Sequence, residues 1–349
     1  MRYKMLGSSG LRVSELCLGT MSLGQDWRFG ADEATSRRVL DAYADAGGNF
    51  LDTANKYHNG QTEDYLGRWM GRKRERLVVA TKYSLAMDHT DPNAAGSHRK
   101  NLVQSVEGSL RRLQTSYVDL LWVHAHDEDT PYEETMRALD DLVRAGKVLY
   151  IGISDTPAWV VSASHVYAEL RGLTPVVATQ LEYNLLARTA ERDLLPMAQH
   201  YGMAVTAWAP LAGGVLTGKY TRGGDNDSLR KAGNQDRGRS SEQGLRIARA
   251  VDAVADELGV SSSQVAVAWV LSRGYRYFPV FGARRPEQVL DILGAADLKL
   301  PAAQLALLEE LTAVELGFPH DFLRSDHMKD MRKGEIRSKV DARPQEPSR

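Results

Sequence analysis

Asn49-Phe50-Leu51-Asp52-Thr53-Ala54-Asn55-Lys56-Tyr57 is a short apolar strand that ends in a carboxylate and is followed, five residues later, by a phenol. Two further apolar stretches end in groups that such a tyrosine would need in order to act near neutral pH. One is followed by Lys82 and the other by His124. Asp52, Tyr57, Lys82 and His124 can converge only if these strands lie side by side. The stretch therefore points to a sheet whose strand ends carry a site.

The same unit, a buried strand followed by a helix, repeats along the chain. Continuous apolar runs are typical of strands that are buried on both faces, and the helices between them carry apolar stripes. Eight such strands argue for an α/β fold, a single (β/α)8 TIM barrel, whose active site lies at the carboxyl ends of the strands. This rule brings the four side chains to one face. The expected strands are residues 16–21, 49–52, 77–82, 118–123, 148–153, 176–182, 203–208 and 277–281.

Four segments lie outside this repeat. Residues 2–15 resemble a β-hairpin that plugs one end of the barrel. Residues 221–244 are polar and glycine-rich, which predicts a mobile insertion after the seventh strand. Residues 318–323 are expected to fold back over the site. Residues 328–349 are charged and predict a disordered tail, which leaves 1–327 as a single barrel domain.

The composition points to a small-molecule role. The 349 residues include 44 Lys and Arg against 45 Asp and Glu, with an isoelectric point near 6.8. No single-sign field therefore attracts nucleic acid or an anionic membrane. Cys17 is the only cysteine, which excludes an internal disulfide, and neither a signal-peptide core nor a membrane-spanning run is present. The sequence predicts a soluble, cytoplasmic protein with a small-molecule partner, and a homo-oligomer stays open.

The four strand-end side chains form a chemically coherent set. A tyrosine has a pKa of about 10, so donating a proton at neutral pH requires a neighbouring cation that favours the phenolate. Lys82 would supply that cation, and Asp52 would hold it in place. His124 would then donate a hydrogen bond to a substrate carbonyl. The simpler alternative is that Asp52 and Lys82 form an ion pair that only closes the barrel mouth.

The chain also contains an ordered series of motifs: Asp52-Thr53-Ala54 with Tyr57, Ala80-Thr81-Lys82, Leu110-Arg111-Arg112-Leu113-Gln114-Thr115, Gly152-Ile153-Ser154, Gln180-Leu181-Glu182-Tyr183-Asn184, Trp208-Ala209-Pro210-Leu211, Leu216-Thr217-Gly218-Lys219-Tyr220 and Gly282-Ala283-Arg284. This series resembles the aldo-keto reductase family, in particular its bacterial type, and is also similar to potassium-channel β subunits. The resemblance implies that an aldehyde or ketone is reduced to an alcohol by hydride transfer. It also implies that Asp52, Tyr57, Lys82 and His124 are the catalytic tetrad, with Tyr57 as general acid.

The resemblance further implies NADPH, bound in an extended form across the barrel mouth without a Rossmann domain, and no Gly-x-Gly-x-x-Gly motif is present. The resemblance assigns Arg284 to the adenosine 2′-phosphate. An arginine fork suits a phosphate better than a ribose hydroxyl, which favours NADPH over NADH. Two departures from the family pattern are Asp155 and Ile292, where many members have asparagine. The implied cofactor residues are Gly19, Thr20, Met21, Asp52, Ser154, Asp155, Gln180, Trp208, Ala209, Pro210, Leu211, Gly213, Leu216, Gly218, Lys219, Gly282, Arg284 and Gln288.

The substrate is harder to read, because specificity in this fold lies in loops. A keto or enoyl nucleotide-deoxysugar is one specialised class of substrate. Two alternatives to a reductase stay open: a Schiff-base aldolase with Lys82 as nucleophile, and a regulatory subunit that binds the nicotinamide cofactor with slow turnover. His126 is read as a loop residue, and no metal site is expected. The expected substrate contacts are Trp27, Phe29, Tyr57, His124 and Phe318.

Overall fold

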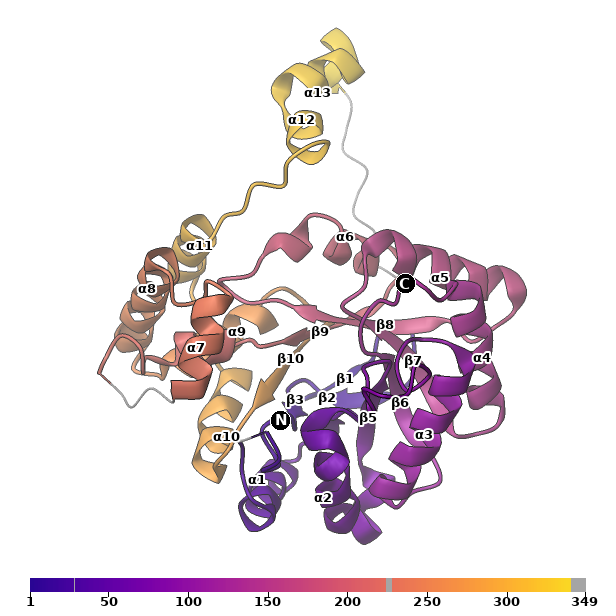
Figure 1. Cartoon of the computed structure of the whole chain (residues 1–349). Coiled ribbons are helices and arrows are strands. Elements are labelled where there is room, and N and C mark those ends of the chain that lie inside the picture. Colours follow the sequence, from indigo (N-terminus) through magenta and orange to yellow (C-terminus); the bar gives the residue numbers. More distant parts are fainter. Residues whose placement is uncertain (28, 224–227, 340–349) are drawn as a thin grey trace.

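A computed structural model of the chain describes residues 1–27, 29–223 and 228–339 (Figure 1). Eight parallel strands close into a barrel in the order β10-β3-β4-β5-β6-β7-β8-β9. The predicted (β/α)8 barrel is therefore confirmed. The strands are β3 (Cys17–Gly19), β4 (Phe50–Asp52), β5 (Val78–Tyr83), β6 (Val118–Val123), β7 (Val148–Ser154), β8 (Val176–Glu182), β9 (Ala204–Trp208) and β10 (Tyr277–Gly282).

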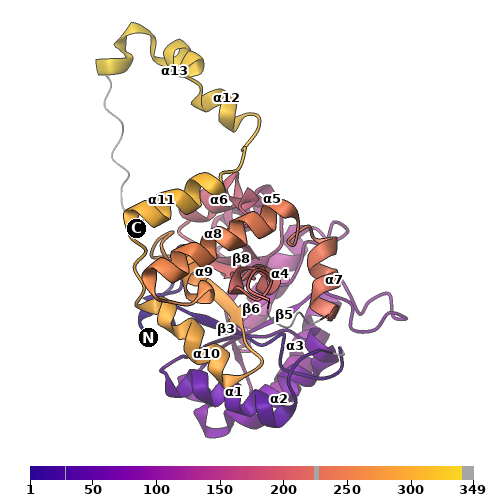
Figure 2. The same ribbon diagram turned by 90° about the vertical axis from the view of Figure 1, so that its left-hand side faces the viewer.

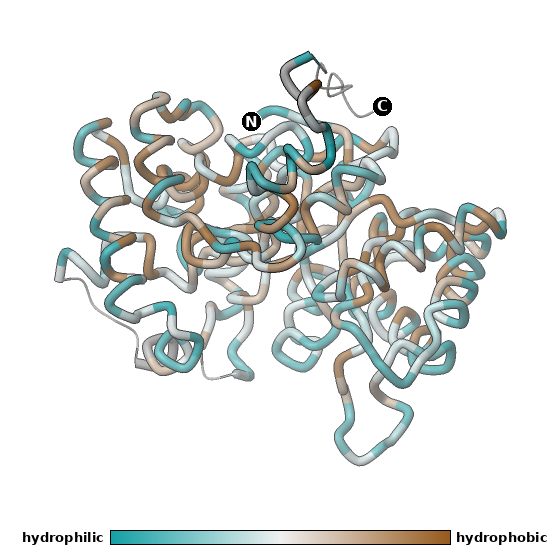
Figure 3. The backbone as a smooth tube through the Cα atoms, turned by 90° about the horizontal axis from the view of Figure 1, so that it is seen from above, coloured by the Kyte–Doolittle hydropathy of each residue, from teal (hydrophilic) through white to brown (hydrophobic). Residues whose placement is uncertain are grey.

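Two apolar layers explain why these strands have no polar face. Inside the barrel, Phe50, Trp122 and Phe278 fill the interior, whereas alternate residues of the same strands pack against the surrounding helices. In Figure 3, hydrophobic colour gathers in the barrel strands, while many helices alternate between hydrophobic and hydrophilic. The helices are α1 (Glu33–Asp45), α2 (Gln61–Met70), α3 (Arg99–Leu113), α4 (Tyr132–Arg144), α5 (Ala158–Arg171), α6 (Leu194–His200), α8 (Glu242–Leu258), α9 (Ser262–Leu271), α10 (Pro286–Leu293) and α11 (Ala302–Leu311).

The predicted N-terminal hairpin is present and seals the amino-terminal end of the barrel. Strands β1 (Tyr3–Met5) and β2 (Arg12–Ser14) pair antiparallel. Leu6 and Val13 are fully buried in the interior cluster. At the hairpin turn, Gly7 lies so close to the bases of β8 and β9 that a Cβ atom would meet the Val177 carbonyl at 2.0 Å. The only open end of the barrel is therefore the one at the carboxyl ends of the strands.

The insertion after β9 is more ordered than predicted. Within it, α7 (Ser228–Asp236) packs against the 3-10 segment η4 (Ala212–Thr217). Asn234 is buried and donates to the Tyr220 hydroxyl at 2.9 Å and to the Gly213 carbonyl at 3.2 Å. The prediction of a mobile segment is thus wrong for 228–244, because buried polar contacts hold it on the barrel. Residues 224–227 lie outside the described part.

The C-terminal segment does not cover the site of its own chain. After α11, helices α12 (His320–Arg324) and α13 (Asp326–Lys333) and the 3-10 segment η6 (Gly334–Lys339) project away from the barrel in both views (Figures 1 and 2). The structure therefore corrects one expectation: 318–323 is not a lid over this barrel. The tail at 328–349 stays a prediction, and within it the structure has α13 and η6. Residues 340–349 lie outside the described part. No helix within the described ranges is long and apolar enough to cross a membrane.

Candidate active site

The centre of the candidate site is a buried ion pair between two neighbouring strands. Lys82 Nζ on β5 donates to Asp52 Oδ2 at the end of β4, at 2.5 Å, and to the Thr53 carbonyl at 2.7 Å. Gln180 Nε2, on β8, donates to Asp52 Oδ1 at 3.0 Å. Both charged side chains are almost completely buried. Each carboxylate oxygen therefore has a donor, which offsets the cost of removing the charges from water.

Tyr57 and His124 complete the cluster. Lys82 Nζ lies 3.1 Å from the Tyr57 hydroxyl and 4.8 Å from the centre of its ring. The Tyr57 and His124 rings meet edge to face, with centroids 5.9 Å apart. His124 Nδ1 is buried and has no hydrogen-bond partner in the protein. The structure thus brings together all four side chains that the strand-end argument selected, although their chemical roles stay predictions.

Burial and charge set the protonation states of this cluster. Burial opposes the Lys82 ammonium, but Asp52 and Tyr57 outweigh this effect and raise the pKa of Lys82. Burial raises the pKa of Tyr57, and the opposing effect of Lys82 does not cancel it. Burial, reinforced by Lys82, lowers the pKa of His124 to about 3. Burial and the Asp52 charge raise the pKa of the interior thiol of Cys17. At neutral pH the site therefore holds an ammonium, a neutral phenol and a neutral imidazole.

Sequence reasoning missed His58, which joins the Tyr57 turn to the loop after β3. His58 adopts a left-handed backbone conformation (φ 49°). Its Nδ1 accepts a hydrogen bond from the Trp27 amide at 3.1 Å, so Nε2 carries the proton that is donated to the Met21 carbonyl, also at 3.1 Å. The imidazole stacks on the Trp27 indole with centroids 4.9 Å apart. A Cβ atom at Gly24 would lie 2.4 Å from this ring, so the loop can pass this close to His58 only with glycine at position 24.

This arrangement forms an aromatic wall beside the tetrad. The Trp27 ring meets Tyr57 edge-on at 6.1 Å, and Phe29 packs against both Trp27 and His58. Trp27 and Phe29, two of the expected substrate contacts, thus lie near Tyr57, whereas Phe318 is 75% exposed on the C-terminal segment and packs only on Phe322 among the described rings. In the sequence, only the position of His58 next to Tyr57 indicated a role in the site. A single histidine does not show which distant residues it will contact.

The residues expected to hold NADPH lie at the carboxyl ends of the barrel strands. Gly19 of β3 pairs with Asp52, and the Thr20 hydroxyl donates to the Asp52 carbonyl at 3.0 Å. Ser154 of β7 pairs with Gln180 of β8, and both are buried. The same end of the barrel carries Met21, Trp208, Ala209, Pro210, Leu211, Gly213, Leu216, Gly218, Lys219, Gly282, Arg284 and Gln288, at or just beyond the ends of β3, β9 and β10.

Several of these residues are engaged within the protein, and the two departures from the family pattern have clear positions. The carboxylate of Asp155 accepts a hydrogen bond from the Trp208 indole at 2.9 Å. Asparagine, which many family members have at this position, could accept the same bond through its side-chain oxygen. Gln288 Oε1 accepts from the Arg284 amide at 2.8 Å. Ile292, the second departure, is buried in the core. The aspartate therefore ties two strand ends together, and Gln288 shapes the turn that presents Arg284.

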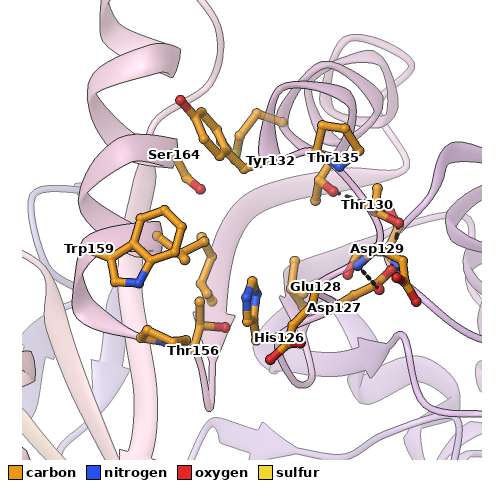
Figure 4. A pocket seen from close by; sticks show the side chains of 17 residues that line it. His126, Asp127, Glu128, Asp129, Thr130, Tyr132, Thr135, Thr156, Trp159 and Ser164 are labelled. Atoms are coloured by element: carbon orange, nitrogen blue, oxygen red, sulfur yellow. Dashed lines mark hydrogen bonds between the residues drawn. The ribbon is translucent and has the colours of Figure 1, made fainter.

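A separate cavity of 440 Å³ opens beside this face, between the first turns of α4 and α5 (Figure 4). His126 points into it, and Trp159 stands at its edge. Its floor includes Val123 and Ile153, which face away from the barrel interior. The loop after β6, expected to shape substrate specificity, thus also lines a cavity on the outer side of the barrel wall. In the described part of the chain, no three His, Cys, Asp or Glu side chains are grouped to hold a metal ion.

Comparison with known proteins agrees with this geometry. The model of the Aldo/keto reductase family matches residues 15–313. The chain belongs to this family. It is therefore an oxidoreductase of a carbonyl-reducing family. Members of this family generally use a nicotinamide cofactor. The family match covers every strand of the barrel.

Fungal members of the family are among its relatives. Norsolorinic acid reductase A of Aspergillus parasiticus is 39% identical over 90% of this chain and 82% of its own length. Aryl-alcohol dehydrogenase [NADP(+)] of Phanerodontia chrysosporium is 37% identical over 91% of this chain and 88% of its own length. An aldo-keto reductase of Aspergillus calidoustus is 37% identical over 93% and 85%. These three relatives are fungal and support the assignment to the family. The sequence had suggested a resemblance to the bacterial type of the family.

The lowered pKa of His124 predicts a pH-dependent stability. The folded-state pKa of about 3 lies below the ordinary value of 6.5, so the unfolded chain binds this proton more tightly. Stability should therefore fall as pH drops from 6.5 towards 3. In His124→Asn this contribution is absent, so urea midpoints measured at pH 7 and pH 5 should differ less than in the unaltered protein. Equal losses in both proteins would contradict the assignment.

The bridge made by His58 predicts a local effect on the loop after β3. His58→Phe keeps an aromatic ring to stack on Trp27 but removes the acceptor for the Trp27 amide and the donor to Met21. Hydrogen exchange of the Trp27 amide should therefore accelerate by at least about ten-fold, because its buried partner is lost. Amides of α4 serve as the internal control. Unchanged protection at Trp27 would show that stacking alone holds the loop.

Proposed function

We propose that this protein is an NADPH-dependent reductase of aromatic aldehydes or ketones. The observation that carries the proposal is the single ammonium of Lys82, which contacts both the buried Asp52 carboxylate and the Tyr57 hydroxyl. A hydroxyl beside a fixed cation can release its proton to a substrate oxygen, because the phenolate left behind is stabilised by the ammonium. An ion pair that merely closed the barrel mouth would not require this contact with Tyr57.

Each side chain has a distinct part in the proposed reaction. Bound NADPH would supply the hydride. Tyr57 keeps its proton at neutral pH, since burial raises its pKa, and donates it to the carbonyl oxygen. Neutral His124 orients that oxygen by a hydrogen bond. Lys82 holds the resulting phenolate. Asp52 keeps the ammonium in place by accepting its hydrogen bond, while its other oxygen accepts from Gln180.

The residues present fit this cofactor. His124 Nδ1 is a buried polar atom without a hydrogen-bond partner in the described part of the protein, so it can still form a hydrogen bond at the centre of the site. Ser154 and Gln180 offer hydroxyl and amide groups at adjacent strand ends. Arg284 precedes the amino terminus of α10, where Arg285 provides no side-chain cap. A 2′-phosphate there would meet both a guanidinium and a helix terminus, which supports NADPH over NADH.

The proposed substrate class follows from the wall of the site. Trp27, His58 and Phe29 form a stacked and edge-on aromatic set beside Tyr57, which suits a planar aromatic group. The printed name of the relative from Phanerodontia chrysosporium refers to aryl alcohols and NADP+. Both observations support an aryl carbonyl compound over the nucleotide-deoxysugar. Loss of NADPH absorbance with aryl aldehydes, aryl ketones and keto-sugars tests this preference, and steady turnover separates an enzyme from a cofactor-binding regulatory subunit.

Replacement of the proposed acid tests the chemistry. Tyr57→Phe should lower kcat by roughly 10² to 10⁴ and leave NADPH affinity almost unchanged, because only proton donation is lost. Tyr275→Phe is a matched control, since its hydroxyl contacts Met5 at the sealed end of the barrel. Turnover and fluorescence titration with NADPH give the two readouts. A Tyr57→Phe protein with near-normal kcat would remove Tyr57 from the mechanism.

The cofactor preference has its own test. Arg284→Ala should weaken NADPH binding by roughly ten- to a hundred-fold and leave NADH binding almost unaltered, because a charge-assisted contact contributes about 1.5 to 3 kcal/mol. Arg285 is adjacent, so Arg284→Ala/Arg285→Ala should show a larger effect. Fluorescence titration with each cofactor measures both affinities. Equal losses for NADPH and NADH would mean that Arg284 supports the turn after β10 and does not read the phosphate.

A further inference from the structure

The C-terminal arm, residues 318–339, presents apolar side chains to solvent. Two of its helices have only five and eight residues, and isolated helices this short are marginal in water. Figures 1 and 2 place α12 and α13 clear of their own barrel. The arm therefore lacks the packing that normally stabilises such helices. Its exposed large apolar residues are Phe318, Phe322, Leu323, Met331 and Ile336.

A surface with complementary properties lies on α5, in the ring of helices around the barrel (Figure 1). Trp159, Val166 and Leu170 on α5 are exposed, and Trp159 and Leu170 are 68% and 80% accessible. Their spacing of seven and then four residues puts them on one face of the helix. This apolar stripe begins at the cavity between α4 and α5, whose floor is also apolar (Figure 4). Trp159 thus belongs both to the lining of the cavity and to the stripe.

The charges of the two surfaces are opposite. Residues 127–134, which border the cavity, contain five Asp and Glu and no Lys or Arg. Residues 329–339 of the arm contain five Lys and Arg against two Asp and Glu. Opposite potentials favour the approach of the two surfaces and fix their relative orientation. An apolar side chain of the arm, flanked by cations, therefore matches an apolar cavity with an acidic rim.

We infer that the arm of one copy docks on the α4–α5 cavity and the α5 stripe of a second copy of this chain. In the proposed contact Met331 and Ile336 enter the cavity mouth at Trp159, and Arg332 and Lys333 beside Met331 meet the acidic loop. A second copy is the occupant because the chain carries both complementary surfaces but holds its own arm away from its own barrel. Exchange of arms between two copies repeats the contact twice about a two-fold axis. The inference is independent of the proposed reductase activity.

The oligomeric state tests this inference directly. Light scattering after size exclusion should give a dimer for residues 1–349 and a monomer for a chain that ends at Gly317, with the same circular dichroism midpoint for the barrel. Leu170→Glu should raise the dimer dissociation constant by roughly ten-fold or more, since a charge would enter the apolar contact. Leu290→Glu on α10 is the matched control, because Leu290 is also exposed but lies on another helix. A full-length monomer at every concentration, or a dimer that persists without the arm, would overturn the inference.

Engineered cysteines identify which surfaces meet. Cys17 is the only native cysteine and is buried, so it contributes no background crosslink. A mixture of Trp159→Cys chains and Met331→Cys chains should form a disulfide-linked heterodimer under mild oxidation, whereas Leu290→Cys with Met331→Cys should not. A double Trp159→Cys/Met331→Cys chain that closes on itself as a monomer would show that each arm folds onto its own barrel. That result, or equal crosslinking to position 290, would refute exchange between copies.

Discussion

The structure of the site depends on keeping the Lys82 ammonium and the Asp52 carboxylate together inside the mouth of the barrel. Removing two charges from water is costly, and the interaction is favourable only when other polar groups satisfy the remaining donors and acceptors. Here Gln180, Thr53 and Tyr57 provide those groups. The pair and its partners come from β4, β5, β8 and the turn after β4, so the barrel must close in register before the ion pair is complete. The hairpin closes the other end of the barrel, so a ligand reaches the ion pair through this mouth.

The Tyr57 turn shows how this constraint extends into the loops. Tyr57 must reach the ammonium directly after a strand has ended, and the chain does so through left-handed conformations at His58 and Asn59. Such conformations are uncommon for residues other than glycine and are kept only where surrounding contacts hold them. His58 is held by its bonds to the loop after β3. His58 therefore takes part both in the turn after Tyr57 and in the aromatic wall, so Tyr57 and the wall beside it are held by one element.

Residues near the barrel strands were predictable because periodicity and the strand-end rule act locally. Asp52, Lys82 and His124 each follow an apolar run, so the topology alone gathers them. The bonds of His58 were not predictable, since they join segments that are more than thirty residues apart and carry no common pattern. Asn234 was missed for a similar reason, because a polar residue in a glycine-rich stretch does not reveal that it will be buried. The fold of residues 318–323 over the site was predicted wrongly, because the apolar character of Phe318 and its neighbours does not say which surface they will contact.

Cys17 gives this site a further chemical property. Unsaturated aldehydes and ketones are electrophiles that react readily with the thiolate form of cysteine, whose abundance depends on exposure and pKa. The single thiol of this chain lies inside the barrel, where burial and the Asp52 charge keep it protonated. The same desolvated interior that holds the ion pair thus hides the one soft nucleophile in the protein. An enzyme that handles reactive carbonyl compounds would in this way resist inactivation by the molecules it encounters.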